Sequence, residues 1–363
     1  MTPRRIALLL PDITARRGLE RATTNLANAL VAAGWPVRLI SVFSKGAPPA
    51  YSLDPRIDLI HLGLPRDVTS NVQRLLKLTQ TLRHLEKPTR DVDVVVAAEG
   101  MLSVNAGLLK RLRPRQTVIA WEHLLSELDP PVFRRIRRLV YPALDAVVVL
   151  NEHERRSFES WGLRRVVRIP NVNTFSDVSA ADYEQPRMIT VGAHTADRVK
   201  GFDRLIEQAA PTLQAHPEWS VVIVGRDVPG PELQGLTQAH GVERQVELLP
   251  AVGDIAAQYR RASFMVMASR HETLPMVLLE AKAHGLATLA YDVPHGPREM
   301  IRDGVDGFLV PDGDTELFVR RLEQLVTSEP LRRQLGEAAA DSAGQYSADA
   351  IAVQWRPLIE GGP

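Results

Sequence analysis

The sequence predicts an α/β protein with two doubly wound parallel sheets, each in a domain of its own. Short apolar runs, of the kind that form buried parallel strands, alternate with longer amphipathic segments along the chain. The same alternation restarts in the second half, after a polar segment at residues 176–186 that has no clear periodicity and is the predicted linker. The length of 363 residues agrees with two domains of this kind.

Six apolar runs of the first half are predicted strands, and a seventh segment at residues 166–175 closes that half. The helix predicted between the first two runs covers residues 19–34, with Gly34 as a stop signal at its end. Strands of this kind are buried on both faces of a parallel sheet, so their sequences are almost continuously apolar. The six runs are residues 6–10, 36–43, 57–63, 91–100, 117–123 and 144–154.

The second half repeats this pattern, with a predicted helix at residues 200–217 after its first strand. A last amphipathic helix carries Trp355, and we expect it to pack across the junction of the domains. The predicted domains are residues 1–175 and 176–345, followed by a C-terminal helix in 346–363. The predicted strands of the second half are residues 187–194, 219–227, 246–250, 262–269, 287–293 and 307–311.

Charge is distributed unevenly, although the net charge is only +1. Residues 1–175 contain 27 Lys or Arg and 16 Asp or Glu, whereas the rest of the chain contains 17 and 27. The basic half suits an anionic partner such as a membrane surface, a phosphorylated acceptor or nucleic acid. The chain has no cysteine, which excludes disulfides and thiolate chemistry. Because the first apolar run is too short for a signal peptide, we expect a cytoplasmic protein.

Common nucleotide and metal motifs are missing from the sequence. The loop after the first strand has one glycine, where a dinucleotide-binding G-x-G-x-x-G needs three. There is no P-loop and no H-E-x-x-H, and the ten histidines lack metal-ligand spacing. The basic stretches lack interleaved aromatic residues. We therefore expect neither a metal site nor nucleic acid as a partner.

Two loops combine glycine with charge beside a predicted helix. Gly18 and Glu20 begin the helix after the first strand, where glycine lets a ligand approach and a helix N-terminus attracts phosphate. Arg198 and Lys200 follow the strand that ends at Gly192, and two cations there suit a diphosphate. On spacing alone, an ordinary loop is an equally good interpretation of the first feature and a slightly better one of the second.

Two carboxylates, Glu272 and Glu280, lie on either side of an apolar run. Pro275 suits the first turn of a helix, Thr273 is the expected N-cap, and Gly285 fits just past the end. Glu280 then lies in mid-helix, where a carboxylate is costly to bury unless it is hydrogen-bonded. Vicinal hydroxyls, such as those of a ribose, can donate those hydrogen bonds. An outward-pointing Glu280, and a Glu272 that only favours the helix dipole, are the competing interpretations.

Taken together, these segments resemble the family-4 retaining glycosyltransferases of the GT-B fold, across nearly the whole chain. The two carboxylates match the family's E-x7-E motif in "ETLPMVLLEA", and the lysine lies in "KGFDRLI", where the family has K-G-f-d-x-L-I. The resemblance implies two Rossmann-like domains facing a central cleft, the first for the acceptor and the second for a nucleotide-sugar donor. Further matching segments are RGLER (17–21), IPNVN (169–173), GLATLA (285–290), YDVPHGPREMI (291–301) and DGVDGFLV (303–310).

The resemblance implies roles for the acidic motif. Glu280 would hold the nucleotide ribose, and Glu272 would hold the hydroxyls of the donor sugar near the reacting carbon. Backbone groups beside Glu272 would share that task. They belong to Thr273, Leu274 and Pro275.

The resemblance also implies how the diphosphate is held. Lys200, with Arg198, would neutralise the charge that builds up as the sugar–phosphate bond breaks. Gly18 would let the loop of the first domain approach the donor, and His123 matches a histidine near the donor sugar. Because the cations and a helix N-terminus take the place of a metal, we expect no metal and no cofactor. The other expected donor-binding positions are Gly192, Gly225 and Leu249.

Some positions depart from the family pattern. The family's G-G pair reads Arg17-Gly18, and the glycine after its first glutamate is Thr273. Its arginine after the strand-end glycine is replaced by Ala193, so we assign that arginine's role to Arg198. These changes affect the expected donor sugar more than the expected reaction.

We therefore expect a retaining, metal-independent transferase that moves a hexosyl or N-acetylhexosaminyl unit from a UDP-sugar to a glycan or lipid-linked acceptor, in cell-surface polysaccharide or glycolipid synthesis. A GDP- or ADP-sugar donor is the alternative among enzymes, and a non-catalytic glycan- or membrane-binding GT-B partner is the alternative outside them. Residues 72–87 and 132–141 are basic with apolar faces. They suggest peripheral contact with anionic lipid at the inner face of the cytoplasmic membrane, although solvated helices explain them equally well.

Overall fold

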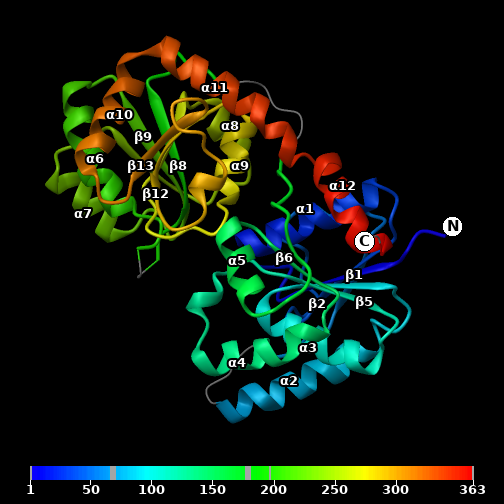
Figure 1. The fold of residues 1–363 in the computed structure, drawn as a ribbon. Coiled ribbons are helices and arrows are strands. Elements are labelled where there is room, and N and C mark those ends of the chain that lie inside the picture. Colours follow the sequence, from blue (N-terminus) through cyan, green and yellow to red (C-terminus); the bar gives the residue numbers. More distant parts are fainter. Residues whose placement is uncertain (1, 66–70, 176–180, 196–197, 362–363) are drawn as a thin grey trace. The chain divides into compact units, whose positions relative to one another are not determined.

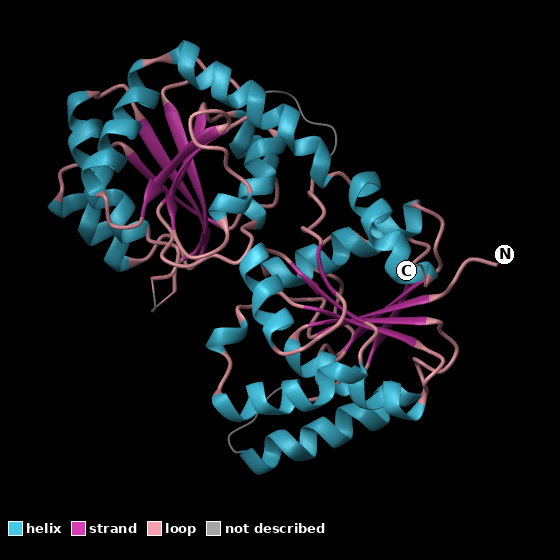
Figure 2. Cartoon of the chain, in the orientation of Figure 1, coloured by secondary structure: helices cyan, strands magenta, loops and turns pink. Residues whose placement is uncertain are grey.

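The structure is a computed structural model and describes residues 2–65, 71–175, 181–195 and 198–361 (Figure 1). The chain divides into two compact units, which are residues Met1–Val172 with Tyr346–Pro363, and residues Asn173–Gln345. Each unit is one parallel sheet with helices on both faces (Figure 2), which confirms the predicted α/β fold class. Part of the predicted linker, residues 176–180, lies outside the described residues.

The sheet of the first unit has the strand order β3-β2-β1-β4-β5-β6-β7, and every pairing is parallel. The order reverses between β1 and β4, the point where open α/β sheets bind ligands at the carboxyl ends of their strands. All five residues of β1 and of β4 are buried, as their apolar sequences predict. The strands are β1 Ile6–Leu10, β2 Val37–Ser41, β3 Asp58–His61, β4 Val94–Ala98, β5 Thr117–Trp121, β6 Ala146–Val149 and β7 Val166–Arg168.

Helices on both faces of this sheet close two hydrophobic clusters. One lies around Leu9, Val95 and Leu102, and the other around Tyr141 and Phe158. The helices are α1 Gly18–Ala32, α2 Asn71–Glu86, α3 Gly100–Leu112, α4 Pro131–Val140, α5 Glu152–Ser160 and α12 Ala348–Glu360. Two short 3-10 helices, η1 Ser126–Leu128 and η2 Tyr141–Ala143, flank α4.

The sheet of the second unit has the order β10-β9-β8-β11-β12-β13, again all parallel. Its reversal lies between β8 and β11. The strands are β8 Arg187–Ala193, β9 Ser220–Arg226, β10 Val246–Pro250, β11 Phe264–Met267, β12 Ala287–Asp292 and β13 Gly307–Pro311. The helices are α6 Phe202–Ala215, α7 Pro231–Ala239, α8 Ile255–Arg260, α9 Met276–Ala283, α10 Thr315–Thr327 and α11 Glu329–Ala343, with 3-10 helices η3 Pro297–Glu299 and η4 Gly344–Tyr346.

The C-terminal helix α12 belongs to the first unit. It packs along α1, and the fully buried ring of Trp355 meets the ring of Trp121 edge to face at 5.6 Å. Packing across the junction of the domains stays a prediction. No helix within the described ranges is long and apolar enough to cross a membrane.

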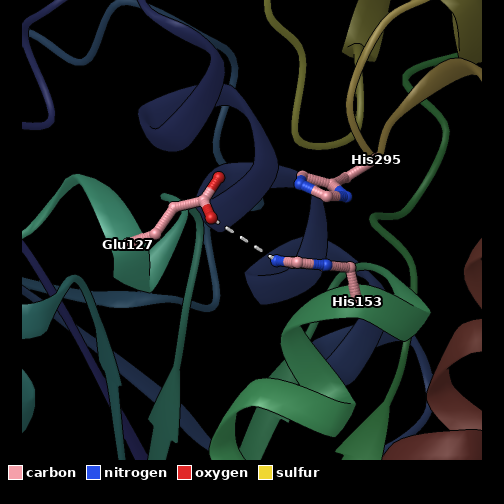
Figure 3. A group of neighbouring side chains, drawn as sticks. All are labelled: Glu127, His153 and His295. Atoms are coloured by element: carbon pink, nitrogen blue, oxygen red, sulfur yellow. Dashed lines mark ion pairs between the residues drawn. The ribbon is translucent and has the colours of Figure 1, made fainter.

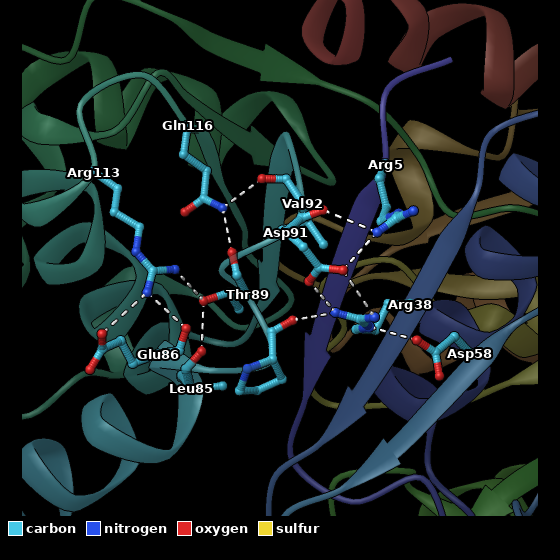
Figure 4. Close-up of polar contacts among 11 residues, drawn as sticks. Arg5, Arg38, Asp58, Leu85, Glu86, Thr89, Asp91, Val92, Arg113 and Gln116 are labelled. Carbon is cyan, nitrogen blue, oxygen red and sulfur yellow. Dashed lines mark hydrogen bonds and ion pairs between the residues drawn. The ribbon is translucent and has the colours of Figure 1, made fainter. Parts of the chain in front are cut away.

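The amino ends of the strands in the first sheet are held by paired charges (Figure 4). Arg38 on β2 donates to Asp58 and to Asp91, each at 2.6 Å, and Arg5 donates to Asp91 at 2.6 Å. Nearby, the amide of Gln116 donates to two backbone carbonyls of the loop before β4. This edge of the sheet is therefore a closed polar network.

Candidate active site

In the second unit, two of the four predicted catalytic residues, Lys200 and Glu272, come together at the carboxyl ends of two adjacent strands. Lys200 lies in the loop after β8, and Glu272 lies in the loop after β11. The ammonium group of Lys200 donates to the Glu272 carboxylate at 2.7 Å, and Glu272 is 8% exposed. These two side chains therefore reach the same point, which the sequence alone does not establish.

Two of the predicted donor-site glycines make room for this pair. A Cβ atom on Gly192 would lie 2.8 Å from Cγ of Lys200, so the lysine stem passes directly over this glycine. A Cβ atom on Gly225, at the end of β9, would overlap the backbone carbonyl of Gly192. Leu249 lies in the edge strand β10, half-buried, in register with Val224. The glycines are explained by close packing at the strand ends, and their contact with a donor stays a prediction.

Arg198, assigned to the diphosphate, is engaged with carboxylates. Its guanidinium forms an ion pair with Glu232 and lies 3.6 Å from Asp203. Its backbone has a φ of 51°, a conformation that L-residues rarely adopt. Its side chain is 51% exposed, so it could turn to an anionic ligand by exchanging these partners. Arg198 is therefore paired with acids outside the E-x7-E motif, whereas Lys200 is paired with Glu272 of that motif.

Two arginines that the sequence analysis did not select hold the loop of the acidic motif. Arg204 donates to the carbonyls of Ala268 and Ser269 at 2.9 and 2.7 Å. Arg270, within that loop, makes a bidentate ion pair with Asp203, both bonds measuring 2.8 Å. Burial alone would raise the pKa of the Asp203 carboxyl, but its hydrogen bonds to Arg270 and to the Arg204 backbone outweigh burial and lower it. Asp203 and Arg204 adjoin the K-G-F segment, so the charges in "KGFDRL" were the signal that could have identified them.

The helix of the acidic motif begins two residues later than predicted. Thr273 is not the N-cap, because α9 starts at Met276 and the residue before it, Pro275, has an extended backbone with a ψ of 115°. For the same reason, Pro275 precedes the first turn and does not belong to it. Gly285 does lie past the end of the helix, with a φ of 68°. Thr273 and Leu274 therefore lie in the loop that leads from Glu272 into α9.

Glu280 is fully buried within α9, and its carboxylate is hydrogen-bonded rather than isolated. Tyr259 of α8 donates to one carboxylate oxygen at 3.0 Å, and Thr174 donates weakly to the other at 3.4 Å. This burial overturns an outward-pointing Glu280. Tyr259, another buried group, was not selected from the sequence. A carboxylate oxygen can accept more than one hydrogen bond, so these bonds are compatible with a further one from a ligand hydroxyl.

In the first unit, Gly18 follows β1, which borders the reversal of the sheet, and His123 follows β5, one strand beyond β4. Gly18 is exposed and begins α1, and its N-cap residue, Arg17, makes no side-chain capping bond. His123 is half-buried two residues after β5, with its ring against that of Trp121 at 4.3 Å. Burial lowers the pKa of His123 to about 3, so its imidazole is neutral near pH 7. Its Nε2 is buried without a hydrogen-bond partner among the described residues.

A buried charge network includes Glu122, the residue that precedes His123. Glu122 accepts a hydrogen bond from Tyr141 at 2.5 Å and pairs with Arg137 at 2.7 Å. Arg137 also pairs with Asp129 and donates to the Tyr141 hydroxyl at 2.9 Å. Since Glu122 and Arg137 are almost completely buried, they neutralise one another and fix the end of β5.

Glu127 and His153, drawn in Figure 3, form an exposed pair in the first unit. The carboxylate and Nε2 lie 3.8 Å apart. Two ligand atoms of one unit are fewer than the three or four protein ligands of a zinc site. His295, also drawn there, belongs to the second unit. The expected independence from metal stays a prediction.

Comparison with known families matches both halves of the chain. Residues 17–172 match the model of the glycosyl transferase 4-like domain, and residues 172–342 match that of glycosyl transferases group 1. The amylovoran biosynthesis glycosyltransferase AmsD of Erwinia amylovora is 30% identical over 98% of this chain and 99% of its own. A Campylobacter jejuni α-1,4-N-acetyl-D-galactosaminyltransferase, whose name specifies a glycan on undecaprenol-PP, is 25% identical over 94% of each chain.

Solved structures share the fold at lower identity. Sucrose-phosphate synthase of Thermosynechococcus elongatus aligns with a TM-score of 0.82 and 19% identity, covering 99% of this chain and 98% of that one. The Anabaena protein HepE, solved in complex with UDP and glucose, aligns with a TM-score of 0.76 and 16% identity, covering 99% and 100%.

Proposed function

The chain belongs to the family-4 glycosyltransferases of the GT-B fold, and from this premise we propose that it is a retaining, metal-independent enzyme that uses a UDP-sugar. The observation that carries the proposal is the ion pair of Lys200 and Glu272 at the strand ends of the second unit, beside a buried Glu280. A cation for phosphate, an acid for sugar hydroxyls and an acid for ribose are what a nucleotide-sugar donor requires.

The proposed reaction breaks the bond between the anomeric carbon and the diphosphate and forms a bond to an acceptor hydroxyl. Negative charge grows on the leaving diphosphate, so a cation beside it stabilises the transition state more than the ground state. Lys200 takes this role, joined by Arg198 once that guanidinium exchanges its carboxylate partners. The leaving phosphate oxygen takes the acceptor's proton on the same face of the sugar, which retains the anomeric configuration.

UDP is the proposed nucleotide, and a hexosyl or N-acetylhexosaminyl unit the proposed cargo. Support comes from HepE, a structural neighbour solved with UDP, and from the Campylobacter relative, which transfers N-acetylgalactosamine. The proposed acceptor is a glycan or a lipid-linked glycan, because AmsD acts in amylovoran biosynthesis and the Campylobacter acceptor is linked to undecaprenol-PP. GDP- and ADP-sugars are the competing donors.

A panel of UDP-, GDP- and ADP-sugars, scored for slow hydrolysis of the donor, tests this proposal without knowledge of the acceptor. We expect measurable release of UDP from at least one UDP-sugar, with or without EDTA, and little release from the other nucleotides. Preferred hydrolysis of a GDP- or ADP-sugar would overturn the choice of UDP. No hydrolysis and no nucleotide binding would instead favour a non-catalytic partner that keeps the fold.

Contact with an anionic membrane is the second part of the proposal, and α4 supports it. On this helix Val132 and Leu139 are 65% and 73% exposed, with exposed Arg135 and Arg138 beside them. Such a basic face with apolar side chains suits the surface of an anionic bilayer, which at the inner face of the cytoplasmic membrane agrees with the expected cytoplasmic location. Sedimentation with phosphatidylglycerol vesicles but not with phosphatidylcholine vesicles is the expected result, and Leu139→Ser should weaken it. Sedimentation with neither kind of vesicle, or to the same extent with both, would overturn this part of the proposal.

A further inference from the structure

Glu99 occupies the ligand-binding edge of the first unit, although no motif marks it. It directly follows β4, beside the reversal of strand order between β1 and β4. In the neighbouring strand β5, Trp121 is in register with Ala98. The residues that follow these two, Glu122 and then His123 on one strand and Glu99 on the other, therefore leave the sheet at the same edge. Parallel sheets bind ligands at this position.

The backbone of Glu99 is strained. Its φ of 148° and ψ of 144° fall in a region that is essentially restricted to glycine. A side chain is kept here at an energetic cost, and such residues cluster at functional sites. The energetic cost of this backbone strain suggests that the Glu99 side chain has a role that offsets it.

Capping of α3 does not explain it. The Glu99 carboxylate accepts hydrogen bonds from the backbone amides of Met101 and Leu102, the latter at a long 3.4 Å. Asn151 and Ser347 cap α5 and α12 with unstrained backbones, at φ values of −141° and −63°. Glutamate is also not among the residues that N-cap positions favour. A helix of this chain can therefore be capped without strain, and by a shorter side chain.

The carboxylate of Glu99 is also poorly neutralised. Among the residues that the structure describes, none donates a side-chain hydrogen bond to it, and Arg137 is already held by Glu122 and Asp129. Burial, together with the negative charge of Glu122, raises the pKa of Glu99 to about 7. On the next strand, the buried Nε2 of His123 also lacks a partner among the described residues. Two polar groups with unused capacity thus follow adjacent strands.

We propose that Glu99 binds a hydroxyl group of the acceptor sugar, accepting its O–H. The neutral imidazole of His123, which the family resemblance places near the donor sugar, borders this subsite from the neighbouring strand. A hydroxyl supplies the donor that the carboxylate lacks, and a hydrogen bond to a charged acceptor is stronger than one between neutral groups. The strained backbone holds the carboxylate at the ligand edge. This inference rests on the proposed function, because it needs a hydroxyl-bearing acceptor.

The test compares transfer to an acceptor with transfer to water. The acceptor probe is the lipid-linked glycan fraction extracted from a producing strain that lacks this chain. With a labelled UDP-sugar, Glu99→Gln should lower kcat/KM for that acceptor about 10- to 100-fold, the loss of one hydrogen bond to a charged group. Hydrolysis of the donor and the Kd for UDP should change less than about twofold. Glu159→Gln, an exposed carboxylate of α5, is the matched control and should change neither.

Glu99→Gly separates this role from a structural one. Glycine removes the strain along with the carboxylate, so this variant should unfold at the same Tm as the wild type or a higher one, yet lose transfer as Glu99→Gln does. Transfer that stays within twofold in both variants would overturn the inference, and so would a Tm that falls together with transfer and hydrolysis. Failure of the wild type itself to hydrolyse the donor or transfer sugar would instead overturn the proposed function.

Discussion

The two edges of the first sheet differ in how completely they pair their charged groups. At the amino ends of the strands, Arg38 pairs with both Asp58 and Asp91, and its hydrogen bond to Asp91 lowers the pKa of that carboxyl (Figure 4). At the carboxyl ends, Glu122 is paired with Arg137, but Glu99 lacks a side-chain donor among the described residues, and its pKa is raised to about 7. The first edge is built for stability, whereas the second keeps an acid available.

Backbone strain is also distributed unevenly between the amino and carboxyl ends of the strands. Four described residues other than glycine have a positive φ, namely Glu99, Arg198, Asp227 and His295. Each of them lies in a segment that follows the carboxyl end of a strand. Strained residues cluster at functional sites, so this distribution agrees with the proposal that both units bind their ligands at the carboxyl edges of their sheets.

The largest effect should come from the acid at the carboxyl edge of the second sheet. Glu272→Gln removes the charge that holds Lys200 and the proposed sugar contact, so turnover should fall about 100- to 1000-fold, as for loss of a preorganised charged group. Rates of UDP-sugar hydrolysis measure this. Asp312→Asn, an exposed ion-pair partner of Arg204, is the control. Unchanged turnover in Glu272→Gln would show that the carboxyl edge of the second sheet does not carry the reaction in the proposed way.

The raised pKa of Glu99 predicts a dependence of stability on pH. Because its pKa rises from about 4.5 to about 7 on folding, the folded state binds the proton more tightly, and stability falls as pH rises between these values. Glu99→Gln stays neutral and should escape this loss. Its unfolding free energy relative to wild type should therefore rise by about 1–2 kcal/mol from pH 5 to pH 7.5. Parallel urea titrations at both pH values check this, and equal shifts would contradict it.

A smaller effect is expected where a tyrosine positions the proposed ribose-binding acid. Tyr259→Phe removes the hydrogen bond to Glu280 while keeping the ring, so the carboxylate is held less well. The Kd for UDP should rise roughly fivefold, the equivalent of about 1 kcal/mol, with Tm reduced only slightly. Calorimetry with UDP measures the first quantity. A loss of Tm without a change in Kd would show that Tyr259 serves the core alone.

The smallest effect should come from the amino edge. Asp91→Asn weakens two ion pairs of a half-exposed carboxylate, and such pairs contribute less than about 1 kcal/mol each. The Tm should fall by a few degrees at most, without any change in UDP binding or hydrolysis. A clear loss of activity in this variant would break the division between the two edges.

The fold and the family could be predicted because they depend on patterns that the sequence displays. Continuous apolar runs predicted the strands, and ordered motifs predicted the family, and both predictions are confirmed. The N-cap at Thr273 was wrong because it depends on the ψ of Pro275, which propensities do not fix. Neither the partners of Arg198 nor the strain at Glu99 could be read from the sequence, since both arise when distant segments meet. The roles of the individual site residues stay predictions.

Titration of UDP into the wild type and into Glu280→Gln tests the central claim, that the carboxyl edge of the second sheet binds a nucleotide diphosphate. We predict that UDP binds the wild type more tightly than GDP or ADP and that Glu280→Gln weakens it about 10- to 100-fold, the loss of a hydrogen bond to a charged group. Asp91→Asn should bind UDP as the wild type does. Absence of binding by all three nucleotides, or equal binding by wild type and Glu280→Gln, would contradict the account.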